Sequence, residues 1–131
     1  MSTRSCIAIE NKDGTLTAVY CHYNGYLSGV GRTLYNHYYD EKMIRELLSY
    51  GDISSLESEI GVKHDFDDRS TTTFYGRDRD ECDVEARIIS DDSELFEIYD
   101  WSDYYYKFSN GEWLVKNRGS NNWKFLEDEL R

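Results

Sequence analysis

The chain has 131 residues, of which 26 are acidic and 15 are basic, so its formal net charge at pH 7 is −11. A chain of this length is expected to form a single domain over residues 1–131. Its negative charge argues against binding long nucleic acid through the general surface, which would repel the phosphate backbone. No apolar run approaches the roughly 20 residues that span a bilayer, so we expect a soluble, intracellular protein with no membrane partner.

Three cysteines, Cys6, Cys21 and Cys82, are odd in number and lack the paired spacing of a zinc site. We interpret them as small buried hydrophobic residues in a reducing compartment, and we expect no metal and no cofactor. Twelve tyrosines, five phenylalanines and three tryptophans are many for this length. Tyrosine suits a thin core as well as ligand contacts, so the aromatic content alone does not decide the function.

An antiparallel hairpin is predicted at the N-terminus. Residues 4–10 alternate between two faces, residues 16–23 are again extended in character, and the segment 11–15 between them has the composition of a turn. The spacing of the apolar residues then changes from that of a strand to that of a helix, because residues 30–38 place their apolar side chains along one helical face. The N-terminal part of the chain is therefore expected to pair two strands and then to become helical.

A second helix is predicted over residues 41–49, with Asp40 as its N-cap and Gly51 as its end. Ser54 and Glu57 have the spacing of a capping box, which predicts a third, short helical turn ending near residue 60. The central block of the chain is therefore expected to be helical.

A loop without periodicity is expected over residues 61–69, followed by a β-branched and aromatic strand over 71–75. Residues 84–89 are a further candidate strand. A short helix over 91–99 is indicated by the capping box that Asp91 forms with Glu94.

A second hairpin is predicted near the C-terminus, over residues 103–108 and 112–117. The Asn110-Gly111 pair between these aromatic-rich runs is a strong hairpin signal. Residues 123–130 fit either a terminal helix or a last strand. The expected fold class is α+β, with an antiparallel sheet built from the N- and C-terminal hairpins and two to three helices packed on one side of it.

One candidate anion site lies where a glycine-rich loop leads into the first predicted helix. Gly31, Arg32 and Thr33 stand at that helix start, where unpaired N–H groups and the positive end of the helix dipole suit a phosphate. The spacing matches neither the Walker loop nor the dinucleotide fingerprint, so a plain turn is the alternative interpretation.

A second candidate follows the strand over residues 71–75. Phe74 and Tyr75 offer rings for a base, and Arg77 and Arg79 would project on a common side as extended i, i+2 neighbours that hold a pyrophosphate. The alternative pairs these arginines with the nearby acidic residues in a surface salt network of small energetic value.

A third candidate lies in the C-terminal hairpin. Tyr104 and Tyr106 share one face of the first strand, while Asn117 and Arg118 end the second. Aromatic rings beside an arginine and an asparagine are what purine binding requires, although an ordinary hairpin surface can have the same composition.

Catalytic groups are not evident in the sequence. The three histidines lie in different segments, and only His22, which sits among aromatic residues at a strand end, is a candidate; a structural role suits it better. The carboxylates are spread along the chain as expected for a solvated surface. We therefore do not expect an enzyme.

Several segments taken together resemble a group of small phage proteins, the first family of Thoeris anti-defense proteins. The segments that carry this resemblance are residues 2–10, 20–26, 29–34, 51–56 and 75–79. The similarity covers roughly the first 80 residues and weakens afterwards.

The resemblance implies a non-enzymatic protein that sequesters a cyclic nucleotide immune signal in the cytoplasm of the bacterial host. The implied ligand is glycocyclic ADP-ribose, with cyclic trinucleotides as further ligands, and sequestration would block Thoeris- or CBASS-type immunity. The family forms homo-oligomers, either dimers or hexamers. Its sites place arginines on phosphates, an aromatic ring on adenine and an asparagine nearby, and only these residue types transfer to the second half of this chain.

Two other function classes stay open. An acidic surface of charge −11 also suits a nucleic-acid mimic that occupies the basic groove of a host nuclease or polymerase. A nucleotide-cleaving enzyme would form product from its ligand, whereas a sequestering protein would release the ligand intact.

Overall fold

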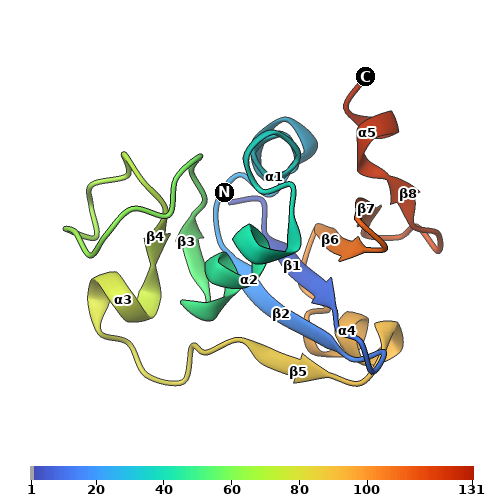
Figure 1. The fold of residues 1–131 in the computed structure, drawn as a ribbon, viewed down its shortest axis with the longest axis horizontal. Helices are drawn as coiled ribbons and strands as arrows, with labels where there is room; N and C mark the ends of the chain where they lie inside the picture. The colour runs from blue at the N-terminus through green and yellow to red at the C-terminus, as the bar shows by residue number, and fades with distance from the viewer. Residues whose placement is uncertain (1) are drawn as a thin grey trace.

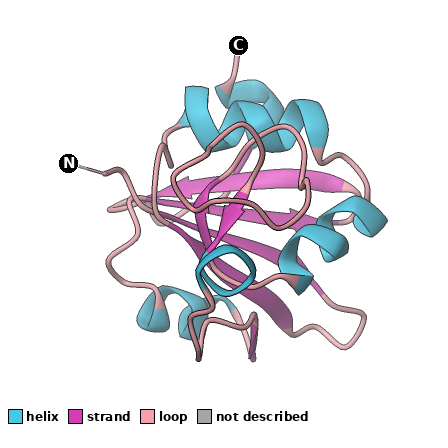
Figure 2. Ribbon diagram, turned by 90° about the vertical axis from the view of Figure 1, so that its left-hand side faces the viewer, coloured by secondary structure: helices cyan, strands magenta, loops and turns pink. Residues whose placement is uncertain are grey.

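A computed structural model describes residues 2–131, which form one mixed sheet with helices on both of its faces (Figure 1, Figure 2). The strand order is β4-β3-β2-β1-β6-β7-β8, and β5 also pairs with β2. The strands are β1 (Ser5–Glu10), β2 (Leu16–Cys21), β3 (Ile53–Ser55), β4 (Thr73–Phe74), β5 (Arg87–Ile89), β6 (Tyr104–Ser109), β7 (Glu112–Asn117) and β8 (Lys124–Phe125). The helices are η1 (Leu27–Gly31), α1 (Arg32–His37), α2 (Glu41–Ser49), α3 (Tyr75–Arg79), α4 (Asp92–Ile98) and α5 (Leu126–Glu129). The predicted α+β class is confirmed.

Both predicted hairpins are present. β1 and β2 pair antiparallel with Ile7 opposite Val19, and β6 and β7 pair antiparallel with Tyr106 opposite Val115. At the second turn Asn110 and Gly111 have φ of +53° and +79°, the positive values that a two-residue turn between twisted strands requires. Local turn chemistry therefore sets each hairpin.

The two hairpins join through a parallel pair, β1 with β6, so the sheet is mixed and the fully antiparallel arrangement was wrong. Turn residues decide which strands pair within a hairpin, but not which strand of one hairpin lies beside the other. Two strands from distant parts of the sequence pair with the other edge of β2. β3 pairs with it in parallel at Cys21, and β5 pairs antiparallel with residues 16–18.

Helices cover both faces of the sheet, which corrects the expected packing on one side. Ile7 and Ile9 of β1 pack in the cluster that includes residues of α1 and α2, whereas Cys6 and Ala8 pack in the cluster that includes Leu95 of α4. The reason lies in β1, which has no polar face because residues 5–9 are all buried. A strand of this kind needs cover on both sides.

Two helix caps follow the prediction. The Asp40 side chain accepts a hydrogen bond from the Met43 N–H at 2.8 Å, and Asp91 accepts one from the Glu94 N–H at 2.9 Å. Each cap satisfies an N–H group that the helix cannot bond internally. The helices α2 and α4 therefore begin where the sequence indicated.

The helix predicted over residues 30–38 begins earlier, because the π-helix η1 runs directly into α1. A Cβ on Gly29 would collide with the carbonyl oxygen of Asn24, so only glycine allows the chain to fold back there. The third predicted helical turn, after Ser54, is wrong. Residues 53–55 form β3 instead, and the carbonyl of Ser54 accepts the N–H of Tyr23 at 3.0 Å, so sheet pairing overrides the local capping signal.

Two later segments also differ from the prediction. The strand expected over 71–75 is only β4, and the chain continues as the helix α3. The C-terminal segment contains both expected alternatives in succession, β8 and then α5. Along residues 2–131, no helix combines the length and the apolar character needed to cross a bilayer.

Candidate functional site

Arg77 is a structural arginine and does not face a ligand site. Its guanidinium donates to the carbonyl oxygens of Ile60 at 3.0 Å, Gly61 at 3.2 Å and Thr72 at 2.8 Å, and to Asp78 Oδ1 at 3.0 Å. Its side chain is only 11% exposed. The predicted phosphate role is therefore corrected: Arg77 links the loop after β3 to the start of α3.

Asp78 is the acidic partner at the centre of this arrangement. Its fully buried carboxylate also accepts the N–H groups of Phe74 at 2.8 Å and His64 at 3.1 Å. Burial raises the pKa of Asp78, but the hydrogen bonds from Arg77 and the two backbone N–H groups outweigh this and hold it below the usual value. We call Arg77, Asp78 and their backbone partners the Arg77 hub.

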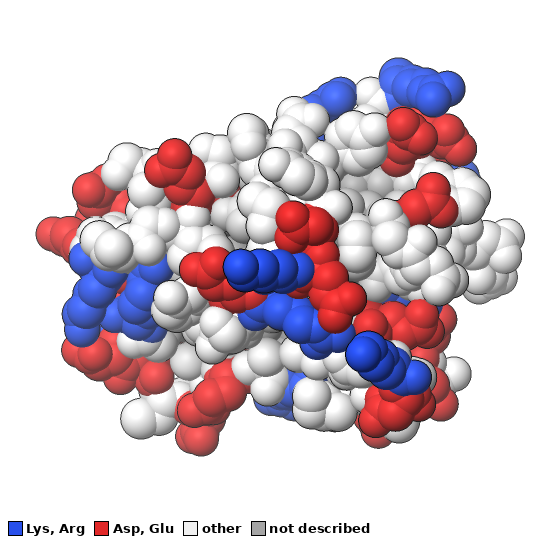
Figure 3. Space-filling model, viewed as in Figure 1, with Lys and Arg blue, Asp and Glu red and all other residues white. Residues whose placement is uncertain are grey.

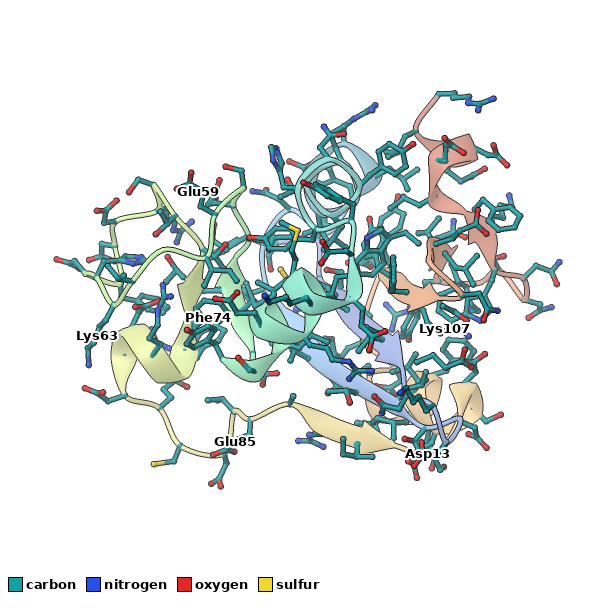
Figure 4. All side chains as sticks on the ribbon, viewed as in Figure 1. Asp13, Glu59, Lys63, Phe74, Glu85 and Lys107 are labelled. Atoms are coloured by element: carbon teal, nitrogen blue, oxygen red, sulfur yellow. The ribbon has the colours of Figure 1, made fainter. Side chains whose placement is uncertain are left out.

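The other residues of the second candidate site also do not come together as a ligand site. Phe74 is fully buried, and Figure 4 shows it between α3 and α2, well inside the outer loop that carries Lys63. It therefore cannot stack on a base. Arg79 is 52% exposed, pairs with Glu81, and lies over the rings of Phe66 at 4.3 Å and Tyr75 at 5.3 Å. The helical backbone of α3 replaces the extended segment that would have aligned the two guanidinium groups.

The predicted helix-start site at Gly31, Arg32 and Thr33 is also corrected, because the helix does not start there. The Arg32 N–H bonds back to the carbonyls of Leu27 and Gly29 within η1, so it is not free for an anion. The Arg32 guanidinium is exposed and donates to the Leu130 carbonyl at 2.9 Å. Gly31 lies against Tyr106, whose ring would be only 3.3 Å from an added Cβ.

The C-terminal hairpin brings some predicted residues together and separates others. Tyr106 is fully buried and donates to the Gly25 carbonyl at 2.6 Å, so it is part of the core and not a stacking surface. Tyr104 lies opposite Asn117 across the β6–β7 pair, and both line a cavity of about 90 Å³. That volume is below the 300–1,000 Å³ typical of small-molecule sites. Arg118 lies outside this cavity.

Arg118 instead lies in a hollow of about 390 Å³ that it forms with Ser2, Arg4, Trp101 and Asp103. We call this the Arg4–Arg118 hollow. Within residues 2–131, neither guanidinium has a carboxylate within 4.0 Å. Arg118 donates to the Asp100 carbonyl at 2.8 Å, and Asp103 is engaged by the backbone N–H of Arg4 at 3.0 Å. The hollow thus holds two guanidinium groups and one carboxylate, and that carboxylate is engaged by a backbone N–H and not by either guanidinium.

Partly buried aromatic side chains continue from the hollow along one surface. The Trp101 ring meets the Tyr20 ring edge-on, with centroids 4.6 Å apart. Tyr20 in turn lies parallel to Tyr75, at a centroid distance of 6.5 Å, and contacts His22. This aromatic surface consists of Trp101, Tyr20, Tyr75 and His22. Flat rings beside free guanidinium groups are able to receive a base and a phosphate together.

His22, the histidine that the sequence analysis retained as a catalytic candidate, forms a pair with Tyr20. The Tyr20 hydroxyl is hydrogen-bonded to His22 Nδ1. Burial and then the charges of Arg4 and Arg69 lower the pKa of His22, and burial raises the pKa of Tyr20 to about 12. At pH 7 both groups are therefore neutral. We therefore expect the charge of Arg4 to act on the aromatic surface.

The cysteines and acidic residues offer no metal centre within residues 2–131, where no group of three or more His, Cys, Asp or Glu side chains is arranged to hold an ion. Cys6 and Cys21 are buried as predicted, and burial raises the pKa of each thiol. Cys82 is exposed, which corrects the interpretation of all three as buried.

The sequence analysis did not identify Arg4 as a candidate site residue. Arg4 and Asp103 meet because the parallel β1–β6 pair begins with Ser5 beside Tyr104. No local pattern signals a contact between residues so far apart in the chain. Comparison with protein-family models, curated proteins and solved structures finds no match to this chain.

Proposed function

We propose that the chain is a non-catalytic protein that binds and sequesters a small cyclic nucleotide in the Arg4–Arg118 hollow. The observation that carries the proposal is the pair of guanidinium groups without a carboxylate partner beside Trp101, in a hollow of about 390 Å³. In this proposal Arg4 and Arg118 hold phosphate oxygens through charge-assisted hydrogen bonds, and the aromatic surface receives the base.

The anionic body of the protein is compatible with this ligand. A net charge of −11 repels long polyanions, whereas a small nucleotide feels mainly the charges that line its own site. The ligand class, a cyclic ADP-ribose isomer made as an immune signal, comes from the resemblance to the Thoeris anti-defense family. The same source suggests a dimer or hexamer in the cytoplasm of an infected bacterium, which light scattering on the purified protein tests.

Calorimetric titration with glycocyclic ADP-ribose tests the proposal. We expect saturable binding that weakens at least about tenfold in Arg118→Ala and further in the Arg4→Ala/Arg118→Ala double variant, since each charge-assisted contact contributes roughly 1.5–3 kcal/mol. Arg87→Ala is the matched control, because Arg87 is an exposed arginine of β5 that does not line the hollow. Equal loss in the control variant, or no binding of any cyclic nucleotide, would contradict the proposal.

The ligand recovered after incubation separates sequestration from catalysis. A sequestering protein releases intact nucleotide on heating, as mass spectrometry would show. Cleavage product would instead assign the chain to an enzyme, and the neutral Tyr20–His22 pair would be the first group to replace.

The acidic-mimic alternative rests on the charge of −11. The face drawn in Figure 3 shows acidic side chains interleaved with basic ones and no continuous acidic track. A mimic would lose its basic protein partner steeply with added salt and would be indifferent to Arg118→Ala.

A further inference from the structure

A second cavity, of about 340 Å³, lies on a different part of the molecule and has walls of a different chemistry. It is bounded by α1 and the residues after it, the tip of the β6–β7 hairpin and the β8–α5 segment; Figure 1 shows α1 near the top centre and the β8–α5 segment at the upper right. We call it the α1–α5 cavity. Its volume falls within the range of small-molecule sites.

Aromatic rings make up most of the wall. Phe108 and Trp113 are buried and meet edge-on, with centroids 5.3 Å apart. The indole N–H of Trp113 donates to the Tyr38 carbonyl at 2.8 Å, so its polar atom is already satisfied and the rest of the ring is apolar. These two side chains are held by the core and give the cavity a rigid part.

Three more rings line the cavity but remain open to solvent. Tyr39 is 64% exposed, Phe125 is 50% exposed, and Tyr35 is also exposed. Exposed aromatic side chains gathered around one cavity mark an interaction site more often than scattered ones do. Tyr39 and Phe125 are also free to close on a ligand, because the core does not fix their rings.

The charges that line the cavity are all negative. Glu112 and Glu127 are its only charged lining residues, and neither has a basic group within 4.0 Å among residues 2–131. Glu127 is held in place by the Tyr35 hydroxyl, which donates to it at 2.8 Å. In Figure 3 the upper right of the molecule is largely a white surface, with both acidic and basic side chains along its border.

The basic residues near this region do not line the cavity. The charges of Arg131 and Arg32 act on the Tyr35 hydroxyl, and Arg32 is engaged by the Leu130 carbonyl. Two carboxylates and five aromatic rings therefore line the cavity, whereas both arginines act on it from outside its lining. A nucleotide is an anion and would be repelled, so this cavity and the Arg4–Arg118 hollow select opposite charges.

We propose that the α1–α5 cavity is a binding site for a small organic cation of the quaternary-ammonium class. Such a cation is weakly hydrated, places methyl groups against apolar rings, and is attracted to the ring faces and to both carboxylates. A compact inorganic cation would have to exchange its water shell for mainly aromatic walls, which disfavours it. This site does not depend on the proposed nucleotide function.

Choline and its uncharged isostere 3,3-dimethyl-1-butanol test the proposal, because the two share their shape and differ in charge. We expect choline to bind saturably, at least about tenfold more tightly than the isostere, when chemical shifts of the Trp113 indole N–H are followed by NMR. Glu112→Gln should weaken choline severalfold and leave the isostere unchanged. Glu97→Gln, an exposed change on α4, is the matched control and should alter neither.

Tyr39→Leu separates ring electrostatics from simple apolar contact. Tyr39 is exposed, so the variant should fold normally while losing choline affinity and retaining that for the isostere. Equal affinity for choline and the isostere would overturn the proposal in favour of a plain apolar pocket. Absence of saturable choline binding, or insensitivity to Glu112→Gln, would also overturn it.

Discussion

The Arg77 hub and the Arg4–Arg118 hollow place the same side chain in opposite roles. In the hub, Arg77 is 11% exposed and its guanidinium is used by three backbone carbonyls and Asp78. In the hollow, Arg4 and Arg118 are exposed and no carboxylate within residues 2–131 comes within 4.0 Å of either.

This difference shows that the function of an arginine depends on how many hydrogen-bond acceptors of the protein already surround its guanidinium group. A guanidinium has five N–H donors in a fixed fork, and a phosphate needs at least two of them. Arg77 already uses four of its donors on Asp78 and three carbonyls, which leaves too few for a phosphate. Arg118 donates to a single carbonyl and keeps the remaining donors for a ligand.

The largest effect is expected from removing the hub arginine. Arg77→Ala leaves the buried carboxylate of Asp78 without its cation and frees three loop carbonyls, so the free energy of unfolding should fall by about 3 kcal/mol. Urea denaturation followed by fluorescence measures it. Arg77→Lys keeps the charge but cannot reach the same set of acceptors, and an intermediate loss is expected.

Arg79→Ala is the matched control in the same helix, because Arg79 is 52% exposed and pairs only at the surface. Its loss of stability should stay below about 1 kcal/mol. If Arg77→Ala left stability unchanged and instead weakened nucleotide binding, the hub would be a ligand site and the comparison above would be reversed.

The parts of the fold that the sequence predicted are those with local causes. The two hairpins, the Asp40 cap and the Asp91 cap each depend on residues within a few positions of one another. The parallel β1–β6 pair, the cover on both faces of the sheet and the replacement of a helical turn by β3 depend on distant partners. Such partners leave no periodicity in the sequence.

The site was predicted less well for the same reason. Arg77 was identified from its neighbours Phe74 and Tyr75, but its acceptors come from residues 60, 61 and 72, which only the β3–β4 region brings near. Arg118 was predicted to lie beside Tyr104 and Tyr106, but the structure places it in a hollow with Arg4, which belongs to the other end of the chain. The types of residue at the site could therefore be identified from the sequence, whereas the residues that lie next to them in the fold could not.

A smaller effect on stability is expected from replacing the two arginines of the hollow. The Arg4→Ala/Arg118→Ala double variant removes one side-chain hydrogen bond, that of Arg118 to the Asp100 carbonyl, and relieves no buried charge. The free energy of unfolding should change by less than about 1 kcal/mol, as for most exposed substitutions. A loss as large as that of Arg77→Ala would place both arginines in the framework of the fold and remove them from the proposed site.

The smallest expected effect is the pH dependence of folding stability that arises from His22. This residue belongs to the aromatic surface, and the charge of Arg4 in the hollow acts on it. Burial and the charges of Arg4 and Arg69 lower the pKa of His22, so the unfolded chain binds this proton more tightly than the folded one. The His22 contribution to stability is therefore fully present above the unfolded value of about 6.5 and decreases as the pH falls below it, down to the folded pKa.

NMR titration of the His22 ring measures this pKa directly, and Arg4→Ala tests its cause. Removing the Arg4 charge should raise the pKa of His22 part of the way toward its ordinary value, while the contribution of burial remains. Arg87→Ala should leave it unchanged, because that arginine is not among the charges that act on His22. A His22 pKa that does not respond to Arg4→Ala would mean that the free charge of the hollow does not reach the rings, and a ligand could not engage both at once.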